Sequence, residues 1–332
     1  MNQLRLLYLV VVFFCSEIIY AQDIHFSNWA ASPLISAPPL SGNFNGNLRI
    51  LGNFRNQWRS VTTPYKTVAV SAEGREIIHL LPQLQSGLSI SRDMAGDSRW
   101  ITTQAHLILS YRIPLNPKLT IIPLLGSGLT QQRYSDDNLQ FDQQWNGTYY
   151  DPSIQSGENY NLFNNRFWQG HHGVSLEHNG VASTTLLGYS MQINSTTNTS
   201  SGYDDQRSAR TTLLALHRSS IRDDIAIEPS IHIQLQRMHR SILTGVRLYK
   251  KLDTGNWHRA TAYAGVSVRI ADAFIPAIGI EYDQWLGGIS YDINLSQLRI
   301  ASRGRGSAEI FIGTILKKLP HIEPASYCRP LY

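Results

Sequence analysis

The chain alternates between apolar and polar residues over long stretches of its second half. From Ile225 to Gln236 the odd positions are Ile, Ile, Pro, Ile, Ile and Leu, whereas the even positions are Ala, Glu, Ser, His, Gln and Gln. The alternation returns between Arg259 and Ile270. Successive side chains of a β-strand point to opposite faces, so each stretch predicts a strand with one apolar face and one polar face. Such strands build either a soluble sheet or a membrane barrel with a polar lumen.

Fourteen segments have the character of strands. Most are 8 to 14 residues long, and a tilted strand needs about 9–11 residues to cross the outer membrane. The 39-residue connection 132–170 is long enough to hide a strand pair, so twelve or sixteen strands also fit the pattern. The predicted strands are 47–54, 66–73, 83–92, 100–111, 118–131, 171–177, 181–193, 209–219, 225–236, 238–250, 256–270, 274–283, 285–293 and 308–318.

The connections between these segments alternate in length. Bacterial outer-membrane barrels have tight periplasmic turns and long external loops, whereas a soluble sheet has no reason to sort its loops in this way. The sequence therefore predicts an all-β protein, a transmembrane antiparallel β-barrel of the outer membrane with about 14 strands across residues 47–318. Long connections follow odd-numbered strands at 55–65, 132–170, 194–208 and 294–307, and short ones follow even-numbered strands at 116–118, 178–180 and 253–255.

The two ends of the chain read differently from the barrel. Residues 1–21 have the charge, apolar core and small terminal residue of a secretory signal peptide, which directs export. Residues 22–46 are rich in proline and glycine, so we expect an irregular segment that lies in the periplasm or plugs the lumen. The proline-containing tail 319–332 should project into the periplasm. Cleavage removes Cys15 and leaves Cys328 alone, without a partner for an intramolecular disulfide.

Composition narrows the class of protein. Charged residues make up 16% of the chain and the net charge is +5, without a basic cluster of the kind that binds nucleic acid. The mean hydropathy of −0.21 is too polar for a helical membrane protein, but it suits a barrel in which alternate residues face lipid.

No residue pattern indicates catalysis, a cofactor or a metal. His171 and His172 are adjacent in a predicted strand and point to opposite faces, so they cannot easily share an ion. The chain lacks Gly-x-Ser-x-Gly, and Gly304-Arg305-Gly306 is too short for a phosphate loop. Charged residues on the polar faces instead predict an ion-pair network that narrows the lumen. Its candidates are Glu228, His232, Arg247, Arg259, Arg269, Glu281, Asp283 and Asp292.

Three stretches carry a resemblance to a known family. The first consists of residues 22–27, a segment rich in asparagine and glycine at 41–50, and the sequence Arg-Asn-Gln-Trp at 55–58. The second covers 288–296, 301–306 and Glu309, and the third is the tail 327–330. Together they resemble the PorP/SprF family of outer-membrane proteins of the type IX secretion and gliding system of Bacteroidota. The resemblance and the external loops give the candidate partner-binding residues Arg55, Asn56, Gln57, Trp58, Arg303, Arg305 and Cys328.

The resemblance implies a non-enzymatic barrel that helps secrete, anchor or tether an exported surface protein or adhesin. Its partners would be that cargo, periplasmic components of the type IX system and outer-membrane lipid, but not nucleic acid. Two alternatives stay open at the level of sequence. One is an outer-membrane porin or a transporter of small solutes or lipids, and the other is an outer-membrane hydrolase.

Overall fold

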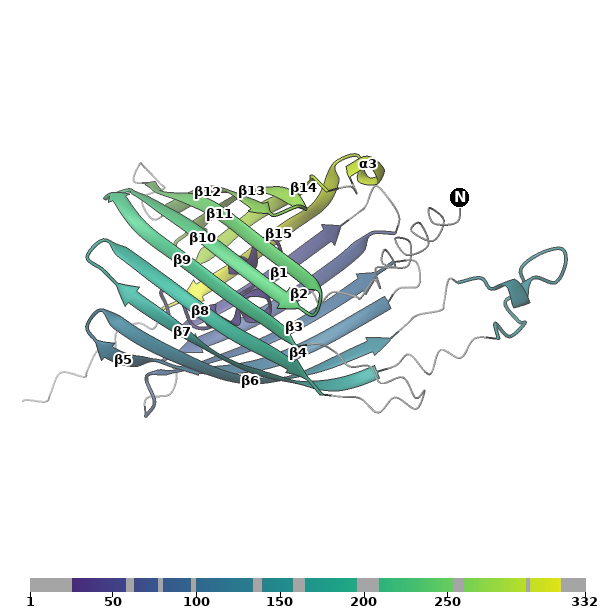
Figure 1. Cartoon of the computed structure of the whole chain (residues 1–332), viewed down its shortest axis with the longest axis horizontal. Helices are drawn as coiled ribbons and strands as arrows, with labels where there is room; N and C mark the ends of the chain where they lie inside the picture. The colour runs from purple at the N-terminus through teal and green to yellow at the C-terminus, as the bar shows by residue number, and fades with distance from the viewer. Residues whose placement is uncertain are drawn as a thin grey trace, which may run out of the picture.

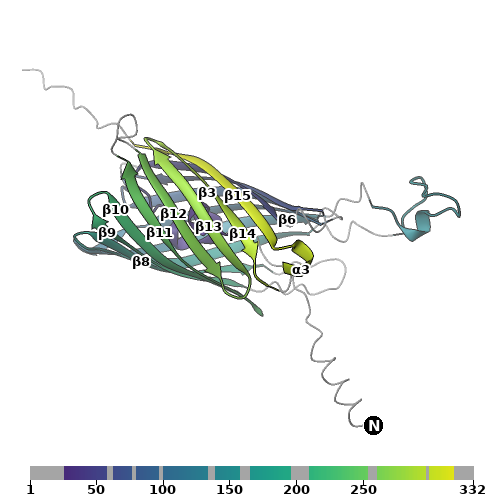
Figure 2. The same ribbon diagram turned by 90° about the horizontal axis from the view of Figure 1, so that it is seen from above.

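The protein is a closed antiparallel β-barrel (Figures 1 and 2). The computed structural model describes residues 26–57, 63–76, 80–96, 100–133, 139–157, 165–195, 209–252, 260–296 and 299–317. Neighbouring strands of the wall pair in chain order, except that β4 and β5 both pair with β6, and β1 (Leu48–Gln57) pairs with β15 (Arg305–Leu316), so the ring is closed. Among these residues no helix is long and apolar enough to cross a membrane.

Fourteen strands form the wall, which confirms the predicted number. β5 (Ile113–Asn116) follows β4 after a single residue, and both pair with β6, so together they act as one bent strand of the wall. The other strands are β2 Tyr65–Arg75, β3 Leu84–Ala95, β4 Trp100–Tyr111, β6 Leu119–Arg133, β7 Asn165–Asn179, β8 Ser183–Asn194, β9 Arg210–Arg222, β10 Ile225–Gln236, β11 His239–Leu252, β12 Ala260–Arg269, β13 Ala273–Tyr282 and β14 Trp285–Asn294.

The two ends of the barrel differ as the connection lengths predict. We call the end where β1 begins and β15 ends the turn end, and the opposite end the loop end. The turn end holds the two-residue turns 223–224 and 283–284, whereas 134–164 and 195–209 connect strands at the loop end. The predicted turn at 253–255 lies outside the described residues.

The outer face of the barrel is a continuous apolar surface. The alternation of β2 exposes Val68 and Val70 between the buried Thr67, Ala69 and Ser71. Similar outward-facing aliphatic residues follow around the wall, and Leu125 on β6 is 68% exposed. A surface of this extent cannot face water without cost, and it matches the lipid-facing band of a transmembrane barrel.

The lumen is occupied by the segment that precedes β1. Residues 26–46, which we call the plug, contain three short helical turns: η1 (Trp29–Ala31), α2 (Pro33–Ser36) and η2 (Pro38–Leu40). Proline suits the first position of a helical turn, because its missing N–H would have no partner there, and α2 and η2 both begin with proline. A wall of fourteen strands encloses more space than its own side chains can fill, and the plug takes up that space.

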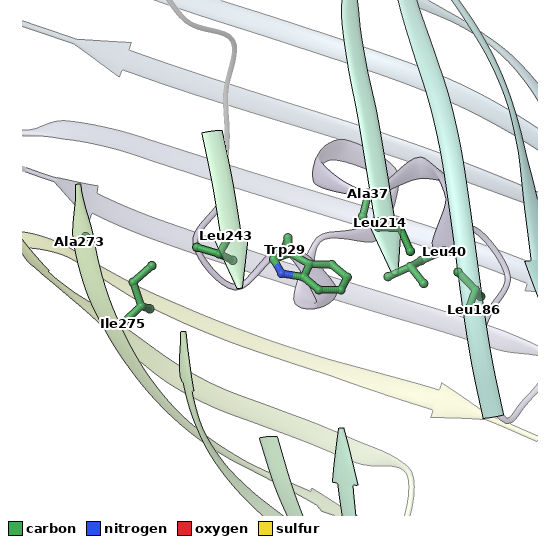
Figure 3. Packing of buried hydrophobic residues seen from close by; sticks show 8 residues of the cluster. All are labelled: Trp29, Ala37, Leu40, Leu186, Leu214, Leu243, Ala273 and Ile275. Atoms are coloured by element: carbon green, nitrogen blue, oxygen red, sulfur yellow. The ribbon is translucent and has the colours of Figure 1, made fainter. Parts of the chain in front are cut away.

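Apolar residues of the plug pack against a patch of the wall (Figure 3). Leu34, Ile35 and Ala37 are 1%, 2% and 0% exposed. A side chain that faced a water-filled channel would stay accessible, so these three side chains are covered by the wall and by the rest of the plug. The largest cluster joins Trp29, Ala37 and Leu40 of the plug to Leu186, Leu214, Leu243, Ala273 and Ile275 of the wall.

The lipid-facing assignment predicts the effect of an outward charge. Leu125→Arg places a guanidinium near the middle of β6 on the outer face, and it should destabilise the barrel by about 2–4 kcal/mol. Urea unfolding in lipid vesicles measures this change, with Leu125→Ala as the matched control for lost packing. Equal unfolding midpoints for the Arg and Ala variants would contradict a lipid contact at this position.

Candidate functional site

The first described residues of the plug are held by a carboxylate of the wall. The backbone N–H groups of Ser27 and Asn28 donate to the two oxygens of Glu309, at 2.8 and 2.9 Å. The Ser27 hydroxyl donates to Asp292 at 2.8 Å and accepts a hydrogen bond from Arg269 at 2.6 Å. Arg269 is the last residue of β12, at the loop end. The described part of the plug therefore starts at the loop end of the lumen.

Two arginines balance the charge of these carboxylates. Arg55 lies 3.0 Å from Glu309, and Arg269 lies 3.4 Å from Asp292. All four side chains are buried, so removal of one partner would leave an uncompensated charge in a poorly solvated site. Arg269 and Asp292, both candidates for a lumen network, contact each other. Arg55, a candidate for partner binding, faces the lumen and pairs with the residue that holds the plug.

A second ion-pair cluster centres on Glu228 of β10. Its carboxylate accepts hydrogen bonds from Arg218 at 2.8 Å, from Tyr249 at 3.0 Å and from Arg247 at 3.4 Å. Arg247 also donates to the Asn28 side chain at 3.1 Å. Glu228 and Arg247 were both candidates for the lumen network, and the structure joins them to each other and to the plug.

His232 contacts the middle of the plug. Its ring stacks on Trp29, with a centroid distance of 5.1 Å and an interplanar angle of 8°. Its Nε2 atom lies 2.9 Å from the Ser36 carbonyl, which also accepts a hydrogen bond from Gln234 at 3.1 Å. A helical turn leaves carbonyl groups unpaired at its C-terminal end, and these two wall side chains satisfy the last one of α2.

The C-terminal part of the plug, around Gly42, is hydrogen-bonded to the wall at the turn end. Gly42 has a φ of +69°, and its N–H donates to Glu73, which also accepts from Arg49 at 2.7 Å. A Cβ atom at Gly42 would lie 2.4 Å from the Gln85 side chain, so only glycine fits both the backbone and the space. The plug therefore runs through the lumen from the loop end at Ser27 to the turn end at Gly42.

The remaining predicted residues lie apart from these clusters. Glu281 is exposed at the turn end of β13, and Asp283 lies in the turn after it with a φ of 55°, so the prediction that Asp283 belongs to the strand is wrong by one residue. Asn56 and Gln57 are half-buried at the loop end of β1. Arg303 and Arg305 are exposed at the loop end, and Trp58, Arg259 and Cys328 lie outside the described residues.

The two adjacent histidines separate as their spacing predicts. His171 is buried in the lumen with its ring 4.8 Å from that of His106, whereas His172 lies near Tyr189. In the described part of the chain, no group of three or more His, Cys, Asp or Glu residues could hold a metal ion.

An ordered aromatic loop stands beyond the loop end of the barrel (Figures 1 and 2). In residues 139–157, which we call the aromatic loop, Trp145 and Tyr150 form a β-bridge, with their rings 5.2 Å apart. Trp145 is 48% exposed, and with Tyr150 and Asp142 it lines a hollow of about 400 Å³. The side chain of Asn146 accepts hydrogen bonds from the backbone N–H groups of Thr148 and Tyr149, which stabilise the turn between Trp145 and Tyr150.

These features define the class and the family. An antiparallel barrel with an apolar outer band, a polar wall and a plugged lumen is an outer-membrane β-barrel protein. Residues 18–314 match the family described as "Type IX secretion system membrane protein PorP/SprF". The chain belongs to this family, which confirms the resemblance seen in the sequence and the location in the outer membrane.

Solved structures with a similar barrel share little sequence with the chain. The CymD monoaromatic hydrocarbon channel is 10% identical, with a TM-score of 0.48 and coverage of 86% of this chain and 91% of that one. The Ralstonia pickettii toluene transporter TbuX is 8% identical, with a TM-score of 0.48 and coverage of 86% and 92%. CdiB from Escherichia coli is 10% identical, with a TM-score of 0.45 and coverage of 80% and 62%. A search of curated proteins finds no match.

The Glu309 contacts predict how the plug is held. Glu309→Gln removes the charge that faces Arg55 and weakens the acceptor for the two plug N–H groups, so it should lower the free energy of unfolding by about 3 kcal/mol. Urea unfolding in detergent micelles measures this loss, and limited proteolysis should cut the plug at a lower protease concentration than in the wild type.

Glu281→Gln is the matched control, because Glu281 is an exposed carboxylate at the turn end. It should change stability by less than about 1 kcal/mol. If Glu309→Gln and Glu281→Gln behaved alike in both assays, Glu309 would not hold the plug.

Proposed function

We propose that the protein is a non-enzymatic anchor of the type IX system that helps to secrete, hold or tether an exported surface protein. Its loop end recognises that protein outside the cell, and its turn end contacts periplasmic components of the system. Membership of the PorP/SprF family supports the link to type IX secretion. The observation that carries the anchor role is the plugged lumen, which leaves recognition to the two ends of the barrel.

The plug argues against free diffusion of solutes. It contacts the wall from Ser27 at the loop end to Gly42 at the turn end, and residues at its centre are fully buried. Porins of 16–18 strands leave an aqueous channel, but here the chain fills that volume with its own residues. A barrel sealed in this way is an anchor that spans the membrane and presents a different surface on each side.

The aromatic loop is the strongest candidate for the external recognition surface. Tryptophan and tyrosine dominate the binding energy of many protein interfaces, because they bury a large area at a low cost in conformational entropy. Trp145, Tyr149 and Tyr150 are exposed around a turn that the Asn146 side chain stabilises by hydrogen bonds. Arg303 and Arg305, which are exposed at the same end, are a second candidate contact.

Capture of cargo tests this role. Tagged protein purified from its host should bring down a large exported surface protein, and Trp145→Ala combined with Tyr150→Ala should reduce the recovery at least about tenfold, since each side chain would be an interface anchor. Met238→Ala is the matched control, because Met238 is an exposed apolar residue in another connection of the loop end. Equal recovery with both variants would exclude the aromatic loop, and recovery of lipid alone would exclude the anchor role.

Conductance in planar bilayers separates an anchor from a porin. The wild-type barrel should be silent, because the plug occludes the lumen. Deletion of residues 23–46 should open a channel of the size expected for a wide, polar barrel. Steady conductance of the wild type, with cargo recovery unaffected by the aromatic-loop substitutions, would favour the porin alternative.

A further inference from the structure

Four cations lie near the loop end on one side of the outer face, on strands between β2 and β7. They are Lys66 on β2, Arg92 on β3, Arg133 on β6 and Arg166 on β7, and all four are exposed. Their direction follows from buried residues at the opposite parity of the same strands, since Thr67, Ser91, Phe167 and, on β6, Thr130 face the lumen at 3%, 2%, 4% and 0% exposure. Adjacent residues of a strand point to opposite faces, so the cations point toward the membrane.

Strand register brings two of the cations into one row. Arg92 lies opposite Thr103, Thr103 opposite Gln131, and Gln131 opposite Arg166. Neighbouring strands are about 4.8 Å apart, so Arg92 and Arg166 stand about 14 Å from each other along the wall. Two polar side chains lie between them, and the row forms a continuous polar strip across four strands.

Each of these arginines has a second cation beside it. Lys66 lies two residues beyond Val68, the cross-strand partner of Arg92. Arg133 lies two residues beyond Gln131, the partner of Arg166. Diagonal neighbours of this kind are about 7–8 Å apart, within joint reach of long side chains. We call the resulting Lys66–Arg92 and Arg133–Arg166 pairs the cationic belt.

The belt borders directly on the apolar band. Ile90 and Trp168 each lie two residues nearer the turn end, on the same outer face, and they are 54% and 63% exposed. An outward tryptophan at this position is typical of the membrane interface. At the turn end of the same strands the outward positions contain no Lys or Arg among the described residues; they hold Ala72, Ser86, Tyr111, Ile121 and Leu176.

We propose that the cationic belt is a binding site for the phosphate groups of anionic lipid, which in the outer leaflet of an outer membrane is lipopolysaccharide. Two cations that converge on one phosphate give short, charge-assisted hydrogen bonds, and arginine matches the geometry of phosphate oxygens. Within the described chain, no carboxylate forms an ion pair with any of the four. The charge of the belt therefore faces the lipid headgroups.

Binding of purified lipopolysaccharide to the full-length barrel in detergent tests the site. Wild-type protein should bind phosphorylated deep-rough lipopolysaccharide, and enzymatic removal of the phosphates should weaken binding at least about tenfold. Replacement of all four cations by glutamine should cause a similar loss, since the belt would then be neutral. Lys250→Gln is the matched control, because Lys250 is an exposed, outward-facing lysine near the turn end of β11, and its affinity should be that of the wild type.

Two further measurements keep the outcome decisive. First, each pair is neutralised alone, in the double variants Lys66→Gln/Arg92→Gln and Arg133→Gln/Arg166→Gln. Second, each variant is checked on a gel without heating, because a folded barrel migrates faster than the unfolded chain. The folded double variants should each lose part of the affinity. Wild-type affinity in both would overturn the proposal. Displacement of the lipid by an equal concentration of inorganic phosphate would also overturn it, because the site would then select free anions.

Discussion

A backbone that crosses lipid must pair every N–H and C=O group within the protein, and the rest of this structure depends on that constraint. The chain meets it by joining β1 to β15 and the bent β4–β5 strand to β6. Closure removes the edges of the sheet. Closure also fixes the number of strands at fourteen, and a barrel of fourteen strands encloses more space than the side chains of its wall can fill. The plug is thus a consequence of the number of strands as much as of its own sequence.

The polar face of the wall and the apolar plug meet through a small number of charged contacts. Glu309 and Asp292 bind plug groups directly, and Arg55 and Arg269 offset their charge. At the turn end, Glu73 and Arg49 repeat the arrangement around Gly42. Ion pairs of this kind add little net stability when both partners are buried, but they penalise any arrangement that leaves one partner alone. They therefore select one position of the plug among many that an apolar segment could take in a wide lumen.

Much of the wall could be predicted from the sequence, because alternation is a local property. The strand at 225–236 was predicted with its observed bounds. The lengths of the connections also predicted which end of the barrel has the long loops. The pairing of Arg247 with Glu228 was not assigned in advance, although both were candidates. Contacts of the plug with Glu309 join residues more than 280 positions apart in the sequence, and no local pattern reports such a pair. The available signal was that Glu309 is the one acidic residue of β15.

The direction in which the plug is threaded limits how it can leave the barrel. Its fixed end joins β1 at the turn end, and its first described residues lie at the loop end. Because the plug is attached to β1 at the turn end, it can leave the lumen only through the turn end. A pull from the loop end would stretch the plug along the barrel axis and leave it in the lumen. The barrel thus resists a pull on the plug from the loop end and can yield to a pull from the turn end. The plug can therefore be released only by a force that acts at the turn end of the barrel.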